Sequence, residues 1–61
     1  MDRKPADAKI VMCEPDQEFC LQSQEGGVYQ VAGSMLFATR DALVRTLLQF
    51  GATIEGDRVW L

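Results

Sequence analysis

The chain contains no histidine, and this absence bears directly on catalysis. Histidine is the usual general base near neutral pH, and without it no serine–histidine or cysteine–histidine pair can form within one chain. The glycine pair Gly26-Gly27 is too short for a phosphate-binding loop, and neither Gly-Lys-Ser/Thr nor the start of a helix follows it. We therefore expect a protein that is not an enzyme and that uses no cofactor.

Cysteine is also scarce, since Cys13 and Cys20 are the only two among 61 residues. Their spacing matches no zinc or redox motif, because such motifs place only two to four residues between the cysteines and add further ligands. In the hairpin predicted around them the pair is diagonal, with Cβ atoms about 7 Å apart, whereas a disulfide needs about 4 Å. We expect two reduced, partly buried thiols and no metal site.

Long apolar runs are missing as well. No segment approaches the roughly 18 apolar residues of a transmembrane helix, and residues 1–7 lack the apolar core of a signal peptide. We expect a cytoplasmic protein with no membrane partner, in which residues 1–8 form a flexible tail and residues 9–61 form a single domain.

Positive charge is sparse, with six basic residues against nine acidic ones and a net charge of −3. Proteins that bind duplex nucleic acid usually carry a basic face, because phosphate neutralisation supplies much of the affinity. The basic residues here are scattered along the chain. This argues against general nucleic-acid binding, although a dimer could gather Arg40 and Arg45 on one surface.

What the chain does contain is a well-marked amphipathic helix over residues 40–50. Thr39 is a favourable N-cap, Asp41 places negative charge near the positive end of the helix dipole, and Gly51 suits the positive φ that follows a helix. Arg45 can pair with Asp41 four residues earlier. The apolar residues cover an arc of roughly 160°, and we expect this whole face to be buried: Leu43, Val44, Leu47, Leu48 and Phe50.

A β-hairpin over residues 52–61 is predicted next, with Gly56-Asp57 as a two-residue turn. The predicted core side carries Ala52, Ile54, Val59 and Leu61. The other side carries Thr53, Glu55, Arg58 and Trp60. Trp60 is thus a large aromatic on the more polar side, where it either packs on Arg58 or the N-terminal segment or anchors a partner.

The N-terminal half predicts a first hairpin from residues 9–13 and 19–23. Its turn, residues 14–17 with Pro15 in second position, has a type I sequence. This register places Met12 opposite Phe19 and Ile10 opposite Leu21.

A third strand is predicted after a three-residue loop, Glu25-Gly26-Gly27. That loop sets Leu21 opposite Val31, the register that keeps one apolar face continuous. The strand alternates Tyr29, Val31, Met35 and Phe37, and Gly33 marks a bulge or bend.

Together these elements predict a small α+β domain of order β-β-β-α-β-β, in which an antiparallel sheet packs on one amphipathic helix. The terminal hairpin either extends the sheet or folds as a flap. A chain of 61 residues is near the lower limit for a self-sufficient core, so we expect a homodimer. The other sheet face is half apolar, which favours a contact surface over scattered hydrophobes: Val11, Cys13, Cys20, Val28 and Leu36.

The first functional hypothesis is a small, non-catalytic protein-interaction or regulatory module that self-associates or binds another protein. Two predicted faces can provide the contact. One carries Trp60, Arg58 and Thr53, and the other carries Cys20 and Leu36.

The alternative is a nucleic-acid-binding transcriptional regulator. The helix over residues 40–50, followed by a hairpin with Arg58 just after its tip, resembles the last helix and wing of a winged-helix domain. The resemblance covers residues 40–61 only, and strands replace the preceding helices of that family. It implies nucleic-acid contacts from Arg40, Arg45, Gln49 and Arg58.

Overall fold

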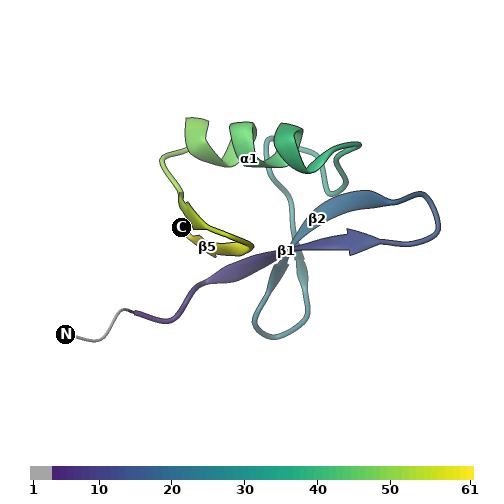
Figure 1. Ribbon diagram of the computed structural model, residues 1–61. Helices are drawn as coiled ribbons and strands as arrows, with labels where there is room; N and C mark the ends of the chain where they lie inside the picture. Colours follow the sequence, from purple (N-terminus) through teal and green to yellow (C-terminus); the bar gives the residue numbers. More distant parts are fainter. Residues whose placement is uncertain (1–3) are drawn as a thin grey trace.

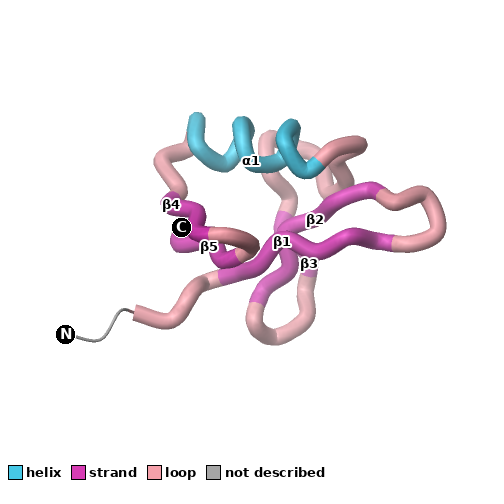
Figure 2. The backbone as a smooth tube through the Cα atoms, viewed as in Figure 1, coloured by secondary structure: helices cyan, strands magenta, loops and turns pink. Residues whose placement is uncertain are grey.

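The computed structural model describes residues 4–61, which form one five-stranded antiparallel sheet and one helix. The elements are β1 Ala8–Cys13, β2 Glu18–Ser23, β3 Val28–Tyr29, α1 Arg40–Gln49, β4 Thr53–Glu55 and β5 Arg58–Trp60. The predicted order is confirmed, and α1 lies across one face of the sheet (Figure 1). The strand order is β3-β2-β1-β5-β4, so the terminal hairpin extends the sheet beside β1 (Figure 2).

The first hairpin has the predicted register. Met12 lies opposite Phe19 and Ile10 opposite Leu21. Both strands begin one residue earlier than predicted, at Ala8 and Glu18. The loop over residues 14–17 contains a cis Glu14–Pro15 peptide bond and places Gln17 at φ 56°. Its type I geometry stays a prediction.

The second loop has three residues, but they are residues 24–26 and not the predicted 25–27. Leu21 therefore lies opposite Tyr29, two residues from the predicted partner Val31. Gly26 at φ 97° explains the placement, since three-residue hairpin loops put a positive-φ glycine in their last position. A shift of two residues leaves the side chains of Val28 and Tyr29 on their predicted faces.

The predicted long third strand is broken. The chain reverses at Ala32-Gly33, with φ values of 54° and 81°, and Val31 and Ser34 pair across this tight turn. Gly33 therefore forms a bend, as expected, and this bend ends the regular strand pairing. Phe37 then pairs with Phe19 and packs at the edge of the core.

The helix begins at Arg40 as predicted and ends at Gln49, one residue before the predicted end at Phe50. The Thr39 hydroxyl accepts a hydrogen bond from the Ala42 amide at 3.1 Å, and Gly51 follows the helix at φ 84°. The Asp41–Arg45 ion pair forms at 2.9 Å. Between the N-cap and the glycine, α1 is a short segment that contacts β2 and β4.

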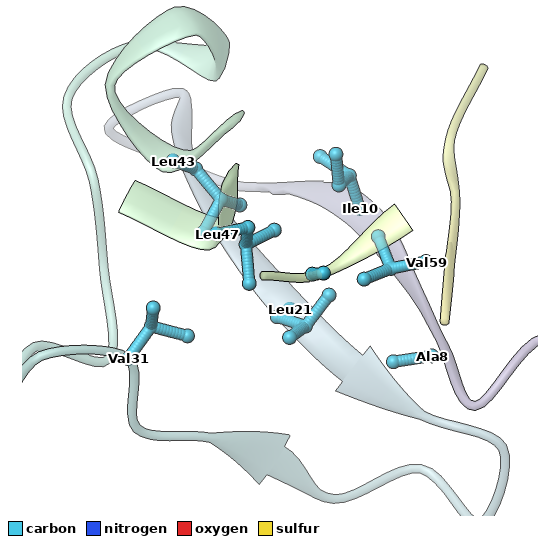
Figure 3. Close-up of a cluster of buried hydrophobic side chains, with 8 residues drawn as sticks. Ala8, Ile10, Leu21, Val31, Leu43, Leu47 and Val59 are labelled. Atoms are coloured by element: carbon cyan, nitrogen blue, oxygen red, sulfur yellow. The ribbon is translucent and has the colours of Figure 1, made fainter. Parts of the chain in front are cut away.

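The hydrophobic core lies between α1 and the sheet. Figure 3 shows Leu47 of α1 beside Leu21 of β2. The buried set is Ala8, Ile10, Leu21, Val31, Leu43, Leu47, Ala52 and Val59, with Phe19, Phe37, Val44 and Ile54 packed against it. The prediction for three other residues is wrong, because Leu48, Phe50 and Leu61 are 55%, 69% and 60% exposed. The sheet covers only the Leu43–Leu47 stripe of the helix, and Leu61 follows the last residue of β5.

The terminal hairpin is paired as predicted, with Glu55 opposite Arg58 and Thr53 opposite Trp60. Gly56 adopts the expected positive φ of 62°. The Arg40 guanidinium connects this turn to the start of α1, because it donates to the Gly56 carbonyl and lies 3.3 Å from the Asp57 carboxylate. Within residues 4–61, no helix has the length and apolar character needed to cross a membrane.

Candidate interaction surfaces

The sheet face opposite α1 carries a groove of about 540 Å³. Its floor comes from three neighbouring strands, where Lys9 lies opposite Gln22 on one side and Arg58 on the other. Trp60 lines the groove, as do Lys4, Pro5 and Ala6 of the N-terminal segment. We call this the basic groove, defined by Lys4, Lys9, Gln22, Arg58 and Trp60.

The N-terminal segment is held against the sheet from Lys4 onward. The Trp60 indole N–H donates to the Lys4 carbonyl at 2.7 Å, and the Gln24 amide donates to the Ala6 carbonyl. The Asp7 carboxylate accepts from the Leu61 amide at 2.8 Å. Residues 4–8 thus contact the sheet directly. The flexible tail predicted over residues 1–8 stays a prediction, and residues 1–3 lie outside the described part. The packing predicted for Trp60 on the N-terminal segment is confirmed.

The basic groove holds two adjacent cations. Lys9 and Arg58 face each other directly across β1 and β5, and neither forms an ion pair with a carboxylate of residues 4–61. Lys4 also lines the groove, 4.0 Å from Asp7. Glu55 lies opposite Arg58 on the edge strand β4 but does not line the groove. The groove is therefore a locally positive site on a chain of net charge −3.

The two thiols are free, as predicted, but they are closer than the cross-strand geometry suggested. Their Sγ atoms lie 3.0 Å apart. Cys20 is only 1% exposed, and burial raises the pKa of its thiol to about 11, with further contributions from the hydrogen bond and charge of Cys13. The Cβ separation of a diagonal pair does not fix the distance between its Sγ atoms, because the two side chains can lean toward each other.

A second, apolar groove of about 280 Å³ opens beside the end of α1. Its floor includes the buried residues Leu21, Val31 and Leu47, and its rim carries the exposed side chains of Phe50 and Leu61. None of the lining side chains is charged. We call this the apolar groove, defined by Leu21, Tyr29, Val31, Leu47, Phe50 and Leu61.

The structure brings together only part of the predicted partner-binding set. Trp60 and Arg58 meet in the basic groove, and Thr53 is exposed on β4 opposite Trp60. Leu36 is exposed away from this groove, next to the bridged residue Phe37. The side chain of Cys20 is buried, so it is not available to a partner in this conformation.

The residues predicted for nucleic-acid contact are not gathered on one surface. Arg40 is paired with Asp57, and Arg45 with Asp41. Gln49 is exposed at the end of α1, whereas Arg58 lines the groove on the opposite face of the sheet. The helix and hairpin therefore do not present the common basic surface that the winged-helix resemblance implies.

Sequence reasoning missed the residues that complete both grooves. Lys9 and Arg58 become neighbours only through the β1–β5 pairing, which joins distant parts of the chain. Phe50 was assigned to the core, although its position beside Gly51, at the end of the helical pattern, is a signal that it could escape burial. Among residues 4–61, no three histidine, cysteine or acidic side chains gather in a way that could hold a metal ion. The chain matches no protein-family model, and no curated protein or solved structure shows significant similarity to it.

Proposed function

We propose that this chain is a non-catalytic protein-interaction module that self-associates through the apolar groove. The observation that carries the proposal is the position of Phe50, a 69% exposed aromatic side chain on the rim of an uncharged hollow. Contiguous exposed apolar surface rimmed by polar residues is typical of protein contact sites. Aromatic residues are enriched at such interfaces.

The apolar groove has the features of a self-complementary surface. In a twofold dimer the same patch on both copies must fit itself, so it has to offer both a protrusion and a hollow. Phe50 and Leu61 supply exposed side chains, and the space above Leu21, Val31 and Leu47 supplies the hollow. Phe50 of one copy can therefore enter the groove of the other.

Charge and size favour a second copy as the partner. Two copies of a chain with net charge −3 repel each other, and an uncharged contact patch adds no local repulsion. A domain of this length gains proportionally more from extra burial than a larger one does. Association through the apolar groove would provide such extra burial, because it would cover the exposed side chains of Phe50 and Leu61.

Sedimentation equilibrium of wild type, Phe50→Ser and Met12→Ser tests the proposal. Met12 is the matched control, because it is also an exposed apolar residue but does not line the apolar groove. We expect a monomer–dimer equilibrium for wild type and Met12→Ser at micromolar concentration, and a monomer for Phe50→Ser. Circular dichroism should show the same helix content in all three proteins.

Two results would contradict self-association through this surface. One is a monomeric wild type throughout the micromolar range. The other is equal dimerisation of wild type and a folded Phe50→Ser variant, which would place the contact elsewhere on the chain.

A further inference from the structure

We infer that the basic groove is a binding site for a small organic phosphate monoester. The site uses the sheet face opposite α1 and shares no defining residue with the apolar groove. It therefore stands independently of the proposed self-association.

Lys9 and Arg58 lie directly opposite each other on β1 and β5. Like charges that face each other across paired strands destabilise a sheet. The chain pairs the arginines of its helix with nearby aspartates, since Arg40 lies 3.3 Å from Asp57 and Arg45 lies 2.9 Å from Asp41. Lys9 and Arg58 have no such carboxylate partner within residues 4–61. An anion bound between them would relieve the repulsion.

These two cations match the charge and the hydrogen-bonding geometry of a phosphate ester. A phosphate monoester carries roughly −1.5 to −2 charges at neutral pH, which two adjacent cations balance. The Arg58 guanidinium can donate two parallel hydrogen bonds to phosphate oxygens, and Lys9 supplies a compact positive charge beside it. Gln22, directly opposite Lys9, adds an amide donor to the same floor.

The groove also has the size and the lining of a small-molecule site. Its volume of about 540 Å³ lies within the range of roughly 300–1,000 Å³ that is typical of small-molecule sites. Trp60 and Pro5 line it and offer apolar contact for an organic substituent. The chain as a whole is acidic, which disfavours a long polyanion such as nucleic acid and favours a compact anion that contacts only the groove.

Amide-detected NMR titration tests the inference with defined probes. Phenyl phosphate is the main probe, inorganic phosphate lacks the organic part, and benzoate replaces phosphate by carboxylate. We expect saturable shifts at Lys9, Gln22, Arg58 and the Trp60 indole N–H, with the tightest binding for phenyl phosphate.

Charge-neutral variants locate the site. We expect Lys9→Gln and Arg58→Gln each to weaken phenyl phosphate binding about tenfold or more, since a hydrogen bond to a charged group typically contributes at least that factor. Arg45→Gln changes the net charge by the same amount on the outer surface of the helix and should leave the affinity within about twofold.

Each other outcome overturns the inference. Shifts that do not saturate, or an equal loss of affinity in Arg45→Gln, would show non-specific attraction. Equal affinity for phenyl phosphate and inorganic phosphate would exclude recognition of an organic ester. Equal affinity for benzoate would exclude phosphate selectivity.

Discussion

The Sγ atoms of Cys13 and Cys20 lie 3.0 Å apart, although the two residues are not cross-strand partners. Cys20 pairs with Val11, and Cys13 pairs with Glu18. The two thiols thus lean toward each other along the same face of the β1–β2 hairpin. The buried member is Cys20, while Cys13 is partly exposed.

This contact predicts that a mild oxidant will join the two thiols within one chain. Diamide accepts the two hydrogen atoms that the thiols lose as the S–S bond forms. We expect the intact mass to fall by two hydrogen atoms and both free thiols to disappear, without a covalent dimer on a non-reducing gel. In Cys13→Ser, the Cys20 thiol should stay reduced, because it has no second thiol beside it and is shielded by burial. Exclusive formation of covalent dimers in wild type would contradict the prediction.

The buried thiol of Cys20 also predicts a loss of stability at alkaline pH. Its pKa is about 11 in the folded protein, chiefly because of burial, against an ordinary value of 9.0. Above pH 9 the unfolded chain therefore loses this proton first, and the free energy of unfolding falls as the pH rises from 9 to 11. The decrease is at most about 1.4 kcal/mol per pH unit.

Urea unfolding of wild type and Cys20→Ala at pH 8, 10 and 11 measures this effect. The difference in unfolding free energy between the two proteins should shrink as the pH rises, because only wild type carries the Cys20 thiol. A difference that stays constant across this range would show that the thiol has the same pKa in the folded and unfolded chains.

Some apolar residues of α1 are buried under the sheet and others are exposed. We therefore expect two leucine substitutions in α1 to change the stability of the protein by different amounts. Leu43 is fully buried under the sheet, so Leu43→Ala removes core packing and should destabilise the protein by about 2–5 kcal/mol. Leu48 is 55% exposed, so Leu48→Ala should change stability by no more than about 0.5 kcal/mol. Chemical denaturation, at protein concentrations too low for dimerisation, measures the unfolding free energy of both variants. Similar losses of stability would show that both leucines are packed.

Local signals predicted much of this fold. The Thr39 cap, Gly51 and the Gly56-Asp57 turn each act within a few residues, and the helix and terminal hairpin appear where these residues placed them. A three-residue loop around Gly26 is compatible with Leu21 opposite either Tyr29 or Val31. Both registers place the same side chains on the same face of the sheet, so side-chain alternation could not distinguish them. The turn at Ala32-Gly33 needs a positive φ at alanine, which residue preferences do not predict.

The candidate surfaces were harder to predict because they depend on contacts between distant parts of the chain. Trp60 was correctly expected to pack on the N-terminal segment, but the basic groove also requires β5 to lie beside β1. The apolar groove exists because only Leu43 and Leu47 of the helix's apolar arc are buried, which leaves Phe50 on its rim. Helical periodicity identified Phe50 as apolar, and only the tertiary arrangement leaves it exposed.

Lys9 and Arg58 of the basic groove face each other and have no carboxylate partner among the described residues 4–61. We therefore expect that removing one of these cations stabilises the protein without ligand. Lys9→Gln removes the repulsion with Arg58 across the paired strands and should raise the free energy of unfolding by roughly 0.2–1 kcal/mol. Arg45→Gln is the matched control, because it makes the same change in net charge but breaks the exposed ion pair with Asp41. It should lower stability by about 0.3–0.5 kcal/mol.

Urea unfolding at low ionic strength in a phosphate-free buffer compares the two variants with wild type. We expect the unfolding free energy to rise in Lys9→Gln and to fall in Arg45→Gln. A general effect of net charge would instead change the unfolding free energy of both variants in the same direction. Adding phenyl phosphate should reverse the order of wild type and Lys9→Gln, because a ligand that binds the folded state stabilises the protein that binds it more tightly. If Lys9→Gln is instead less stable than wild type without ligand, Lys9 has a structural partner, and the groove does not hold an uncompensated pair of cations.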